Sequence, residues 1–453
     1  MPTGVDYILR QYSGRSGGIF LSTIPMVLVL FASCSARVID SKIPPESEQE
    51  QPVLSMMSLL GGPSEDFETK TLRLFAAQHG FHFQHLPTFE SDDGLIALPQ
   101  ELLRKHSTVP DLLEMDIIWP SNLSEDLLDL TPYLGAAVSS FPPELIQPFT
   151  FKGRLIAVPL LIDTGLLYYR SDLLEKYGFR SPPKTWIELE AMSKVIQRGE
   201  RRAGNKNFWG FVWQGRASEG LTCNALEWFG SQAGNHILEP DGTVRVCDRE
   251  VVRALERAVS WIGTISPPGV IAYDVDDSFN VWKTGNAAFM RNWGYVYGFA
   301  TKLSCPVHDR FGVSTLPGGD YGTTRTLGGI AVTVSRYSGH REQAVAALRY
   351  LVSAEVESLR TIQTGTLPPM YSLQQRGDLM KNTPFHDALA GKVMTGVVAR
   401  PAALAGASYE RVSHAFSEAV HAALARQASP AQSLHHLEDQ LVEITGFRPA
   451  ANL

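Results

Sequence analysis

VLSMMSLLGGPSEDFETKTLRLFAAQHGFHFQHL, residues 53–86, is the stretch that decides the class of fold. It opens with an apolar run, residues 53–60, which ends at Gly61-Gly62-Pro63 and so predicts a strand followed by a turn. Residues 65–79 then have the apolar spacing of a helix and stop at Gly80, and residues 81–86 alternate as a second strand. This strand–helix–strand order predicts an α/β fold with a largely parallel sheet.

The same rhythm continues along the chain. LLEMDIIW, residues 112–119, predicts a strand that ends at Pro120. Two apolar runs, 155–161 and 166–169, flank the segment Ile162-Asp163-Thr164-Gly165. Further strands are expected at 311–316 and 329–334, on either side of a Gly-rich stretch. Helices are expected at 171–178, 185–197 (opened by the capping box of Thr185 and Glu188), 248–263, 341–353, 409–425 and 429–444.

A chain of 453 residues is long enough for two lobes, and the order of its elements suggests how they are built. The chain begins one lobe, crosses into a second and returns with more strands, so both lobes are expected to be discontinuous. We expect the first lobe at residues 52–159 and 316–370, and the second at 160–315 and 371–453. Such crossings are natural hinges, and the cleft between the lobes is the natural place for a ligand.

The N-terminus predicts export. Arg10 and Arg15 precede an apolar run, residues 19–33, which is short for a membrane span and typical of a signal peptide, expected at residues 1–33. The end of this run, Ala32-Ser33-Cys34, resembles a bacterial lipobox, in which the Cys is acylated; Phe31 departs from that pattern. Residues 34–51 are rich in Ser, Pro and Glu and predict a flexible tether. An ordinary secretory signal with a chance Cys, or an uncleaved anchor helix, remains the alternative.

Composition excludes several classes of protein. Apolar residues make up 44% of the chain and charged residues 19%, the balance of a soluble globular protein. The net charge of −7, with Lys and Arg scattered, argues against nucleic acid as a partner. Besides Cys34 there are three cysteines, none at a spacing typical of zinc sites. Cys223 and Cys247 could be bridged in an oxidising compartment, or all three could be free thiols.

Catalytic motifs are missing from the sequence. It has no Gly-x-Ser-x-Gly elbow, no His-Glu-x-x-His and no phosphate loop, and we expect neither a metal nor a cofactor. The close histidines His79, His82 and His85 are expected at a solvated edge rather than around a metal. Two pairs of carboxylates, Asp92-Asp93 and Asp276-Asp277, sit in loop-like surroundings and are expected to be surface charge. The pattern favours binding over catalysis.

Aromatic residues cluster with polar ones in two places, NFWGFVWQG at residues 207–215 and FMRNWGYVY at residues 289–297. A sugar site needs flat rings to stack on C–H faces and polar side chains to bond the hydroxyl rim. These aromatic residues could equally pack a core. The Arg-Asn-Trp run that ends at Trp293 is the better candidate, since strand ends are where α/β proteins bind ligands.

Eight stretches, found in the expected order, resemble the maltose- and trehalose-type substrate-binding proteins of bacterial ABC importers. The resemblance covers nearly the whole chain after the tether. The stretches are MDIIWP (115–120), IDTGLLYYRSDLLEKYG (162–178), PPKTWIEL (182–189), GFVWQG (210–215), EGLTCNALEW (219–228), GNAAFMRNW (285–293), TLGGIAVTVSRYS (326–338) and VARPA (398–402).

The resemblance implies the two-lobe α/β fold of type II periplasmic binding proteins, which closes on a ligand. It assigns ligand contacts to five matching positions: Asp116, Asp163, Trp293, Gly329 and Arg400. The carboxylates would accept bonds from hydroxyl groups, the guanidinium would donate, and the indole would stack. Glu65 is a further expected contact, and Trp213 and Glu219 are expected near the pocket.

Two positions depart from the family pattern. Close relatives often carry an aromatic residue where Leu161 stands and a Trp where Ile330 stands. With both rings replaced by aliphatic side chains, the pocket is expected to take a different sugar or a different linkage.

The sequence therefore predicts a binding protein and no enzyme. It would capture a disaccharide or small α-glucoside, pass it to importer permease subunits, and work as a monomer anchored by lipid on the outer side of the cell membrane. Two alternatives remain: an extracellular glycoside-processing enzyme, which would need two carboxylates flanking a bond, and a sensor that reports its ligand to a receptor.

Overall fold

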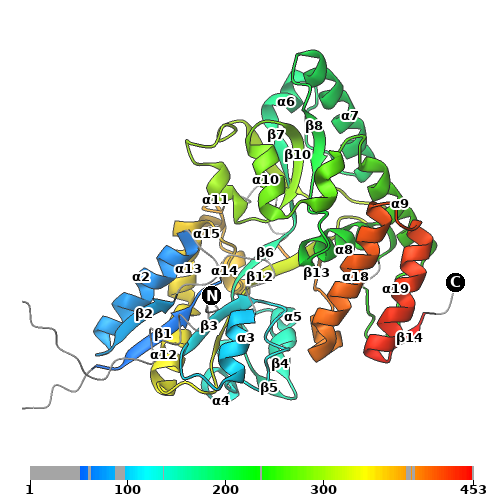
Figure 1. Ribbon diagram of the computed structural model, residues 1–453. Helices are drawn as coiled ribbons and strands as arrows, with labels where there is room; N and C mark the ends of the chain where they lie inside the picture. Colours follow the sequence, from blue (N-terminus) through cyan, green and yellow to red (C-terminus); the bar gives the residue numbers. More distant parts are fainter. Residues whose placement is uncertain are drawn as a thin grey trace, which may run out of the picture. The chain divides into compact units, whose positions relative to one another are not determined.

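The computed structural model describes residues 51–450, except 60–62, 87–96, 136, 235–236, 384–388 and 390–392 (Figure 1). The predicted signal peptide, the lipidation site Cys34 and all of the tether except Gln51 lie outside the described residues. So do Asp92 and Asp93.

One sheet is built around the stretch at residues 53–86. Its strands follow the order β13-β12-β3-β1-β2, and β6 pairs with β12 as well. The first three strands in the chain are parallel, as predicted, but β12 runs antiparallel to both β3 and β6, so the sheet is mixed. The bounds are β1 (Val53–Met57), β2 (His82–Leu86), β3 (Leu112–Asp116), β6 (Val158–Thr164), β12 (Arg325–Val334) and β13 (Val397–Val398).

A second sheet has the strand order β11-β7-β10-β8. Only β8 and β10 are parallel in it; β7 runs antiparallel to both of its neighbours. The bounds are β7 (Leu166–Arg170), β8 (Trp209–Val212), β10 (Ala287–Asn292) and β11 (Phe311–Thr315). Two small pairs complete the strands: β4 (Thr150–Phe151) with β5 (Arg154–Leu155), and β9 (Thr243–Val244) with β14 (Arg448–Pro449).

The chain passes directly between the two sheets. Strand β6 leaves the first sheet at Thr164, and after Gly165 alone the chain enters β7 of the second. It returns from β11 to β12 through residues 316–324. Because β12 and β6 come from these crossings, they need not follow the direction of the βαβ unit, which explains the antiparallel half of the first sheet.

Two segments that the sequence places in the second lobe are associated with the first sheet. Residues 161–164, expected in the second lobe, pair with β12 of the first sheet. Leu373 and Leu379, also expected in the second lobe, pack in the hydrophobic core that contains Leu54 and Leu112 of the first sheet.

The predicted helices all form. Half of the capping box predicted at α7 forms: Thr185 accepts from the backbone N–H of Glu188, but the Glu188 carboxylate accepts from the N–H of Lys184 instead of that of Thr185. Helix α7 runs five residues beyond Gln197. The longer helices are α2 (Pro63–Gln78), α3 (Ala97–Arg104), α7 (Trp186–Arg202), α8 (Glu219–Ala233), α9 (Arg249–Trp261), α10 (Val275–Lys283), α12 (Arg341–Leu351), α13 (Ala354–Thr364), α18 (Tyr409–Leu424) and α19 (Pro430–Thr445). The shorter ones are α4 (Thr131–Leu134), α5 (Pro143–Ile146), α6 (Ser171–Lys176), α11 (Val296–Ala300), α14 (Tyr371–Gln374), α15 (Gly377–Met380) and α17 (Ala402–Ala405).

Some local predictions need correction. The expected strand at 112–119 ends at Asp116, because residues 117–119 turn away, and β12 begins four residues before 329. Asp276 and Asp277 lie in the first turn of α10 rather than in a loop, and Asp277 completes a capping box with Asp274. Carboxylates stabilise the positive end of a helix, which gives this pair a structural role.

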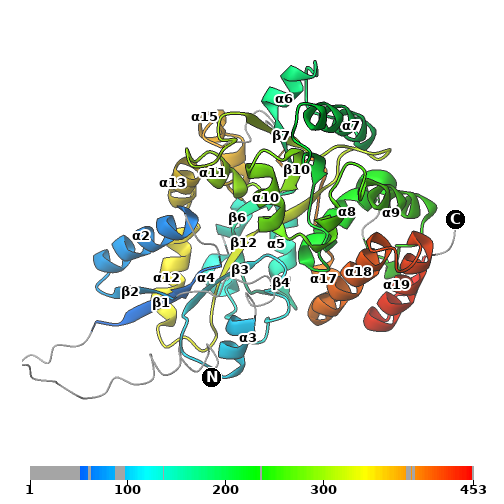
Figure 2. The same cartoon turned by 45° about the horizontal axis from the view of Figure 1, so that its top comes forward.

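Four tryptophans pack in one hydrophobic core against the second sheet. Trp186, Trp213, Trp228 and Trp261 are all 3% exposed or less, and the ring centroids of Trp213 and Trp228 are 5.1 Å apart in a T-shaped pair. Helices α18 and α19, side by side in Figure 2, close this core through Phe416 and Leu437.

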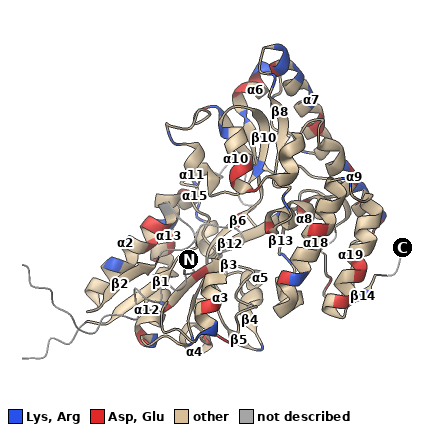
Figure 3. Ribbon diagram, viewed as in Figure 1, with Lys and Arg blue, Asp and Glu red and all other residues tan. Residues whose placement is uncertain are grey.

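Charged residues of both signs are spread along the chain. Figure 3 shows Lys and Arg interspersed with Asp and Glu, with basic residues gathered on the C-terminal half of α7.

Cys223, Cys247 and Cys305 are free thiols, so the alternative without a bridge is confirmed for these three. Among the described residues, no helix is both long enough and apolar enough to cross a membrane.

Candidate functional site

The centre of the candidate site is one row of side chains across the first sheet. Asp116 of β3 stands opposite Ile330 of β12, which stands opposite Leu161 of β6. Directly opposite residues of antiparallel strands point to the same face, so these three side chains share one face. In the next row on the same face, Gly328 stands opposite Asp163.

At one end of the row, Arg400 holds two carboxylates. Its Nη2 lies 2.5 Å from Oδ1 of Asp116 and its Nη1 lies 3.1 Å from Oε1 of Glu219. The Arg400 side chain is 2% exposed, whereas those of Asp116 and Glu219 are 31% and 29% exposed. Burial raises the pKa of Asp116, although the guanidinium opposes that shift. Asp116 thus presents a partly open carboxylate beside a fixed cation.

Glu219 orients this cation. It is the first residue of α8, and both of its oxygens accept hydrogen bonds from α18: Tyr409 Oη donates to Oε1 and Ser413 Oγ donates to Oε2, each at 2.5 Å. Burial and the nearby Glu219 carboxylate raise the pKa of Tyr409 well above its ordinary value, so it stays a donor. The sequence did not point to Tyr409 or Ser413, because they lie far along the chain from Glu219.

Asp163 links the first sheet to the segment after β10. Its Oδ1 accepts from the backbone N–H groups of Thr164 at 2.7 Å and Gly294 at 2.8 Å, and its Oδ2 accepts from Tyr295 at 3.3 Å. Burial raises the pKa of Asp163 to about 6, while these backbone donors oppose the shift. The carboxylate is therefore held in a fixed orientation next to Trp293.

Trp293 follows the last residue of β10, as predicted for a strand-end contact, and it is only partly buried. Its ring lies against Gly328, where an added Cβ would come within 2.7 Å of Cζ3. The guanidinium of Arg291 lies 4.2 Å from the ring centroid. Trp293 thus has a defined position on the face that carries Asp116 and Asp163.

Arg291 is itself anchored in the interior. It is 1% exposed and donates from Nε and Nη2 to the two oxygens of Glu227, at 2.9 and 2.5 Å. Gly165 leaves room for this pair, because a Cβ there would meet Glu227 at 2.0 Å. A charged residue in an otherwise apolar strand was the available signal, since a buried Arg requires a partner.

Gly329 has a backbone conformation that only glycine adopts easily. Its φ is +138°, and a Cβ would lie 2.4 Å from the carbonyl oxygen of Leu161. Its own carbonyl accepts from the N–H of Ile117, next to Asp116, at 3.3 Å. Glycine at this position therefore keeps β6 close to β12 beside the row.

Two predicted residues stand apart from this arrangement. Glu65 lies in the first turn of α2, not in the preceding loop, and pairs with Nδ1 of His85 at 3.3 Å. Trp213 is 0% exposed, and its Nε1 donates to Oγ of Ser266. Since its ring is enclosed by the aromatic core, we correct its assignment from pocket to core.

A cavity of about 670 Å³ reaches the same face, lined by Leu161 and Asp163 together with Tyr295, Tyr297, Thr366 and Asn382 among others. Asp116, Arg400 and Trp293 do not line it. His79 and His82 are exposed, in the turn before the edge strand β2 and at its first residue, as expected for a solvated edge, and His79 Nδ1 bonds the carbonyl oxygen of Phe75. The one group in the described chain that could hold a metal ion shares no residue with this site.

The arrangement suits binding of a polyhydroxyl compound. It offers acceptors at Asp116 and Asp163, a donor at Arg400, an aromatic ring at Trp293 and aliphatic contacts at Leu161 and Ile330. Such a mixture of apolar surface with a few oriented polar groups is typical of small-molecule sites.

Known proteins with a similar sequence or structure are binding proteins. The chain is 42% identical over 359 residues to "Probable ABC transporter-binding protein" of Deinococcus radiodurans, which covers 79% of this chain and 85% of that protein. Maltose-bound MalE3 of T. maritima matches with a TM-score of 0.78 and 32% identity over 86% of this chain and 99% of that structure. A solute-binding protein of Thermotoga lettingae bound with α-D-tagatose matches with a TM-score of 0.76, at 20% identity, over 87% of this chain and all of that structure.

These likenesses establish the two-lobe fold of periplasmic binding proteins. The model of the family "Bacterial extracellular solute-binding protein" matches residues 102–358, more than half of the 453 residues. The chain therefore belongs to the bacterial extracellular solute-binding proteins.

Proposed function

We propose that this protein captures a disaccharide or small α-glucoside between its lobes and delivers it to the permease subunits of an ABC importer. The observation that carries the proposal is the shared face of Asp116, Asp163 and Trp293, with Arg400 fixed at its edge. A sugar offers hydroxyl groups to the first two and to Arg400, and a C–H face to the indole.

The proposed contacts are Asp116, Asp163, Trp293, Arg400, the backbone at Gly329 and, from α2, Glu65. Glu219 acts on the ligand through Arg400, because both of its oxygens are taken by α18. Trp213 is left out, since its ring is enclosed by the core.

Specificity is proposed to depend on the pair of Leu161 and Ile330. They stand directly opposite each other, and each is 5% exposed, so the two replaced aromatic positions form one continuous aliphatic wall. The two similar structures described above hold maltose in one case and α-D-tagatose in the other, a disaccharide and a monosaccharide. A wall without rings favours a sugar held mainly by its hydroxyl groups.

Transport is proposed to follow from a shift between open and closed forms. The ligand contacts groups on both sheets, Asp116 and Asp163 on the first and Trp293 after the second, so only the closed form makes all contacts. The crossings at Gly165 and at residues 316–324 would serve as hinges. The closed form would then dock on the importer, and no bond of the sugar would change.

The test is calorimetric titration with a panel of mono- and disaccharides. We expect at least one sugar to bind with a Kd well below about 1 mM, the affinity at which binding free energy is only about −4 kcal/mol. Recovery of unchanged sugar, checked by chromatography, is expected; conversion to a product would favour the glycoside-processing enzyme instead. If no sugar of the panel binds, the proposed capture is wrong.

Trp293→Ala should weaken sugar binding by about 1–3 kcal/mol without unfolding the protein, as truncation of an aromatic anchor does. Trp209→Ala is the matched control, because Trp209 is also partly buried and also lies under a guanidinium, that of Arg201, at 4.3 Å. Equal affinity of the two variants would place Trp293 outside the binding site.

Anchoring by lipid at Cys34 is proposed from the sequence alone. Cys34→Ala should release the mature protein from washed membranes into the soluble fraction, whereas Cys223→Ala should leave it attached. A membrane-bound Cys34→Ala protein would instead support an uncleaved anchor helix.

A further inference from the structure

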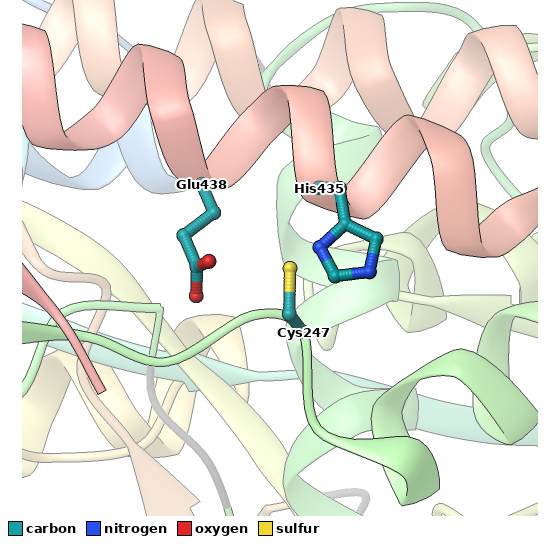
Figure 4. Close-up of side chains that lie close together, drawn as sticks. All are labelled: Cys247, His435 and Glu438. Carbon is teal, nitrogen blue, oxygen red and sulfur yellow. The ribbon is translucent and has the colours of Figure 1, made fainter. Parts of the chain in front are cut away.

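Three potential metal ligands converge outside the sugar site. Cys247 lies in the segment between β9 and α9, and His435 and Glu438 lie on α19. One ligand atom from each lies within 4.8 Å of the other two. Figure 4 shows the thiol of Cys247 directed at the helix, with the imidazole and the carboxylate on either side of it.

The fold holds these residues in register. His435 and Glu438 are three residues apart, so they lie on the same face of α19. The helix is fixed at both ends, by a capping box of Ser429 and Gln432 and by Gly446 at φ +71°. The thiol of Cys247 also donates to the backbone carbonyl of Leu434 at 3.1 Å, which ties its segment to α19.

The surroundings are acidic. Burial raises the pKa of Cys247 to about 12, with further contributions from the carboxylates of Glu438, Asp248 and Asp439. Arg245 pairs with one of these groups, 3.0 Å from Asp248. A bound divalent cation would lower the pKa of this thiol, because it neutralises the carboxylates and stabilises the thiolate.

We propose that Cys247, His435 and Glu438 form a zinc-binding site. Thiolate, imidazole and carboxylate are the ligand types that Zn²⁺ takes in proteins, and bonds of about 2.0–2.3 Å place tetrahedral ligands roughly 3.3–3.8 Å apart. The three atoms therefore need to approach one another by only about 1–1.5 Å. His435 is exposed, so a movement of its side chain can supply most of that approach.

Zinc binding would release one proton. The thiol of Cys247 loses its proton to solvent as the Zn–S bond forms, His435 binds through a neutral ring nitrogen, and water completes the tetrahedron. The metal would join the segment before α9 to the C-terminal helix. Since the ligands must be deprotonated, zinc affinity should fall as the pH is lowered.

The experiment is a titration of the mature protein, free of any histidine tag, with zinc chloride in calorimetry. A parallel titration with Co²⁺ gives a thiolate-to-cobalt charge-transfer band if sulfur binds the metal. We expect one zinc per chain and a higher melting temperature in its presence. Cys247→Ser and His435→Ala should each weaken zinc binding at least about tenfold, the loss caused by removing even an outer-shell partner of a metal.

His436→Ala is the matched control, because His436 is the exposed neighbour on the same helix but is not part of the cluster. It should bind zinc as the wild type does. Absence of binding up to about 100 μM zinc would refute the proposal, and so would equal affinity of the His435 and His436 variants. Should Cys247→Ser fail to fold, His435→Ala and the cobalt band still decide, and the sugar titration is independent of all these outcomes.

Discussion

The chain has eight tryptophans. The groups packed against Trp213 and Trp293 show which of these two rings can contact a ligand. Trp213 is surrounded by Trp228 and Trp261, so none of its surface is free for a ligand. Trp293 has the guanidinium of Arg291 over its ring and the bare backbone of Gly328 beside it, and it remains partly exposed. An aromatic ring held this way loses little side-chain freedom when a sugar stacks on it.

Gly328→Ala tests whether this position of the ring matters. The added methyl would lie 2.7 Å from Cζ3 of Trp293 and would displace the indole from the face that carries Asp163. We expect a loss of sugar affinity of about tenfold, or ~1.4 kcal/mol, with the protein still folded. Calorimetry with the best sugar of the panel measures the first, and a thermal melt checks the second.

The control for this variant is Gly377→Ala. Gly377 is the first residue of α15 and does not line the cavity, and a Cβ there would meet nothing within 4 Å, so the substitution should leave affinity unchanged. If Gly328→Ala bound sugar as tightly as Gly377→Ala, the stacking role of Trp293 would have to be abandoned.

At the scale of elements, one buried charge cluster joins β3, α2 and α13. Glu68 and Glu357 both pair with Arg360, at 2.8 and 3.5 Å, and Glu114 accepts from the backbone N–H of Leu59 at 3.1 Å. All four side chains are at most 6% exposed. One guanidinium cannot neutralise three buried carboxylates, so the carboxylates that it leaves uncompensated must be protonated.

The sign of the resulting pH dependence follows from the pKa values. Burial, with the charge of Glu68 as a lesser cause, raises the pKa of Glu114 from 4.5 to about 8, and burial raises that of Glu357 to about 8. In the folded state these groups keep protons that the unfolded chain has already lost. Their contribution to stability is complete below pH 4.5 and disappears as the pH rises through about 8.

Glu114→Gln should therefore flatten this dependence, because the amide mimics the protonated acid. We expect the variant to match the wild type at about pH 5 and to exceed it by about 1–3 kcal/mol at about pH 9, in urea unfolding at each pH. Glu125→Gln, at a side chain 64% exposed, serves as the control and should change neither value. A wild type as stable at the higher pH as at the lower would contradict the assignment of shared protons.

For the whole molecule, the sequence predicted local structure better than long-range pairing. The helices from 341, 409 and 429 were found nearly at their expected bounds, because caps and apolar spacing are local signals. The mixed direction of the first sheet was missed, since βαβ spacing carries no information about strands that return from another sheet.

The candidate site shows the same division. Asp116, Asp163, Trp293 and Arg400 were expected, but the residues that hold the site together were not. These are Tyr409 and Ser413, which bond Glu219, Glu227, which pairs with Arg291, and Gly328, which lies against Trp293. These partners come from elements far apart in the chain, and only the folded structure brings them within bonding distance. The zinc ligand Cys247 likewise meets α19 only through the fold, so its spacing resembles no metal motif.

Closure on the ligand is a property of the whole molecule and can be measured as such. Because Asp116 lies in the first sheet and Trp293 directly follows β10 of the second, a sugar that touches both should favour the closed form by the difference in its affinity for the two forms. We expect the radius of gyration from small-angle X-ray scattering to decrease on saturation with the best sugar of the panel. Trp293→Ala, at the same sugar concentration, should stay close to the unliganded value, whereas Trp209→Ala should contract. A radius unchanged at saturation, with binding confirmed by calorimetry, would mean that the site is already closed and that transport does not depend on this movement.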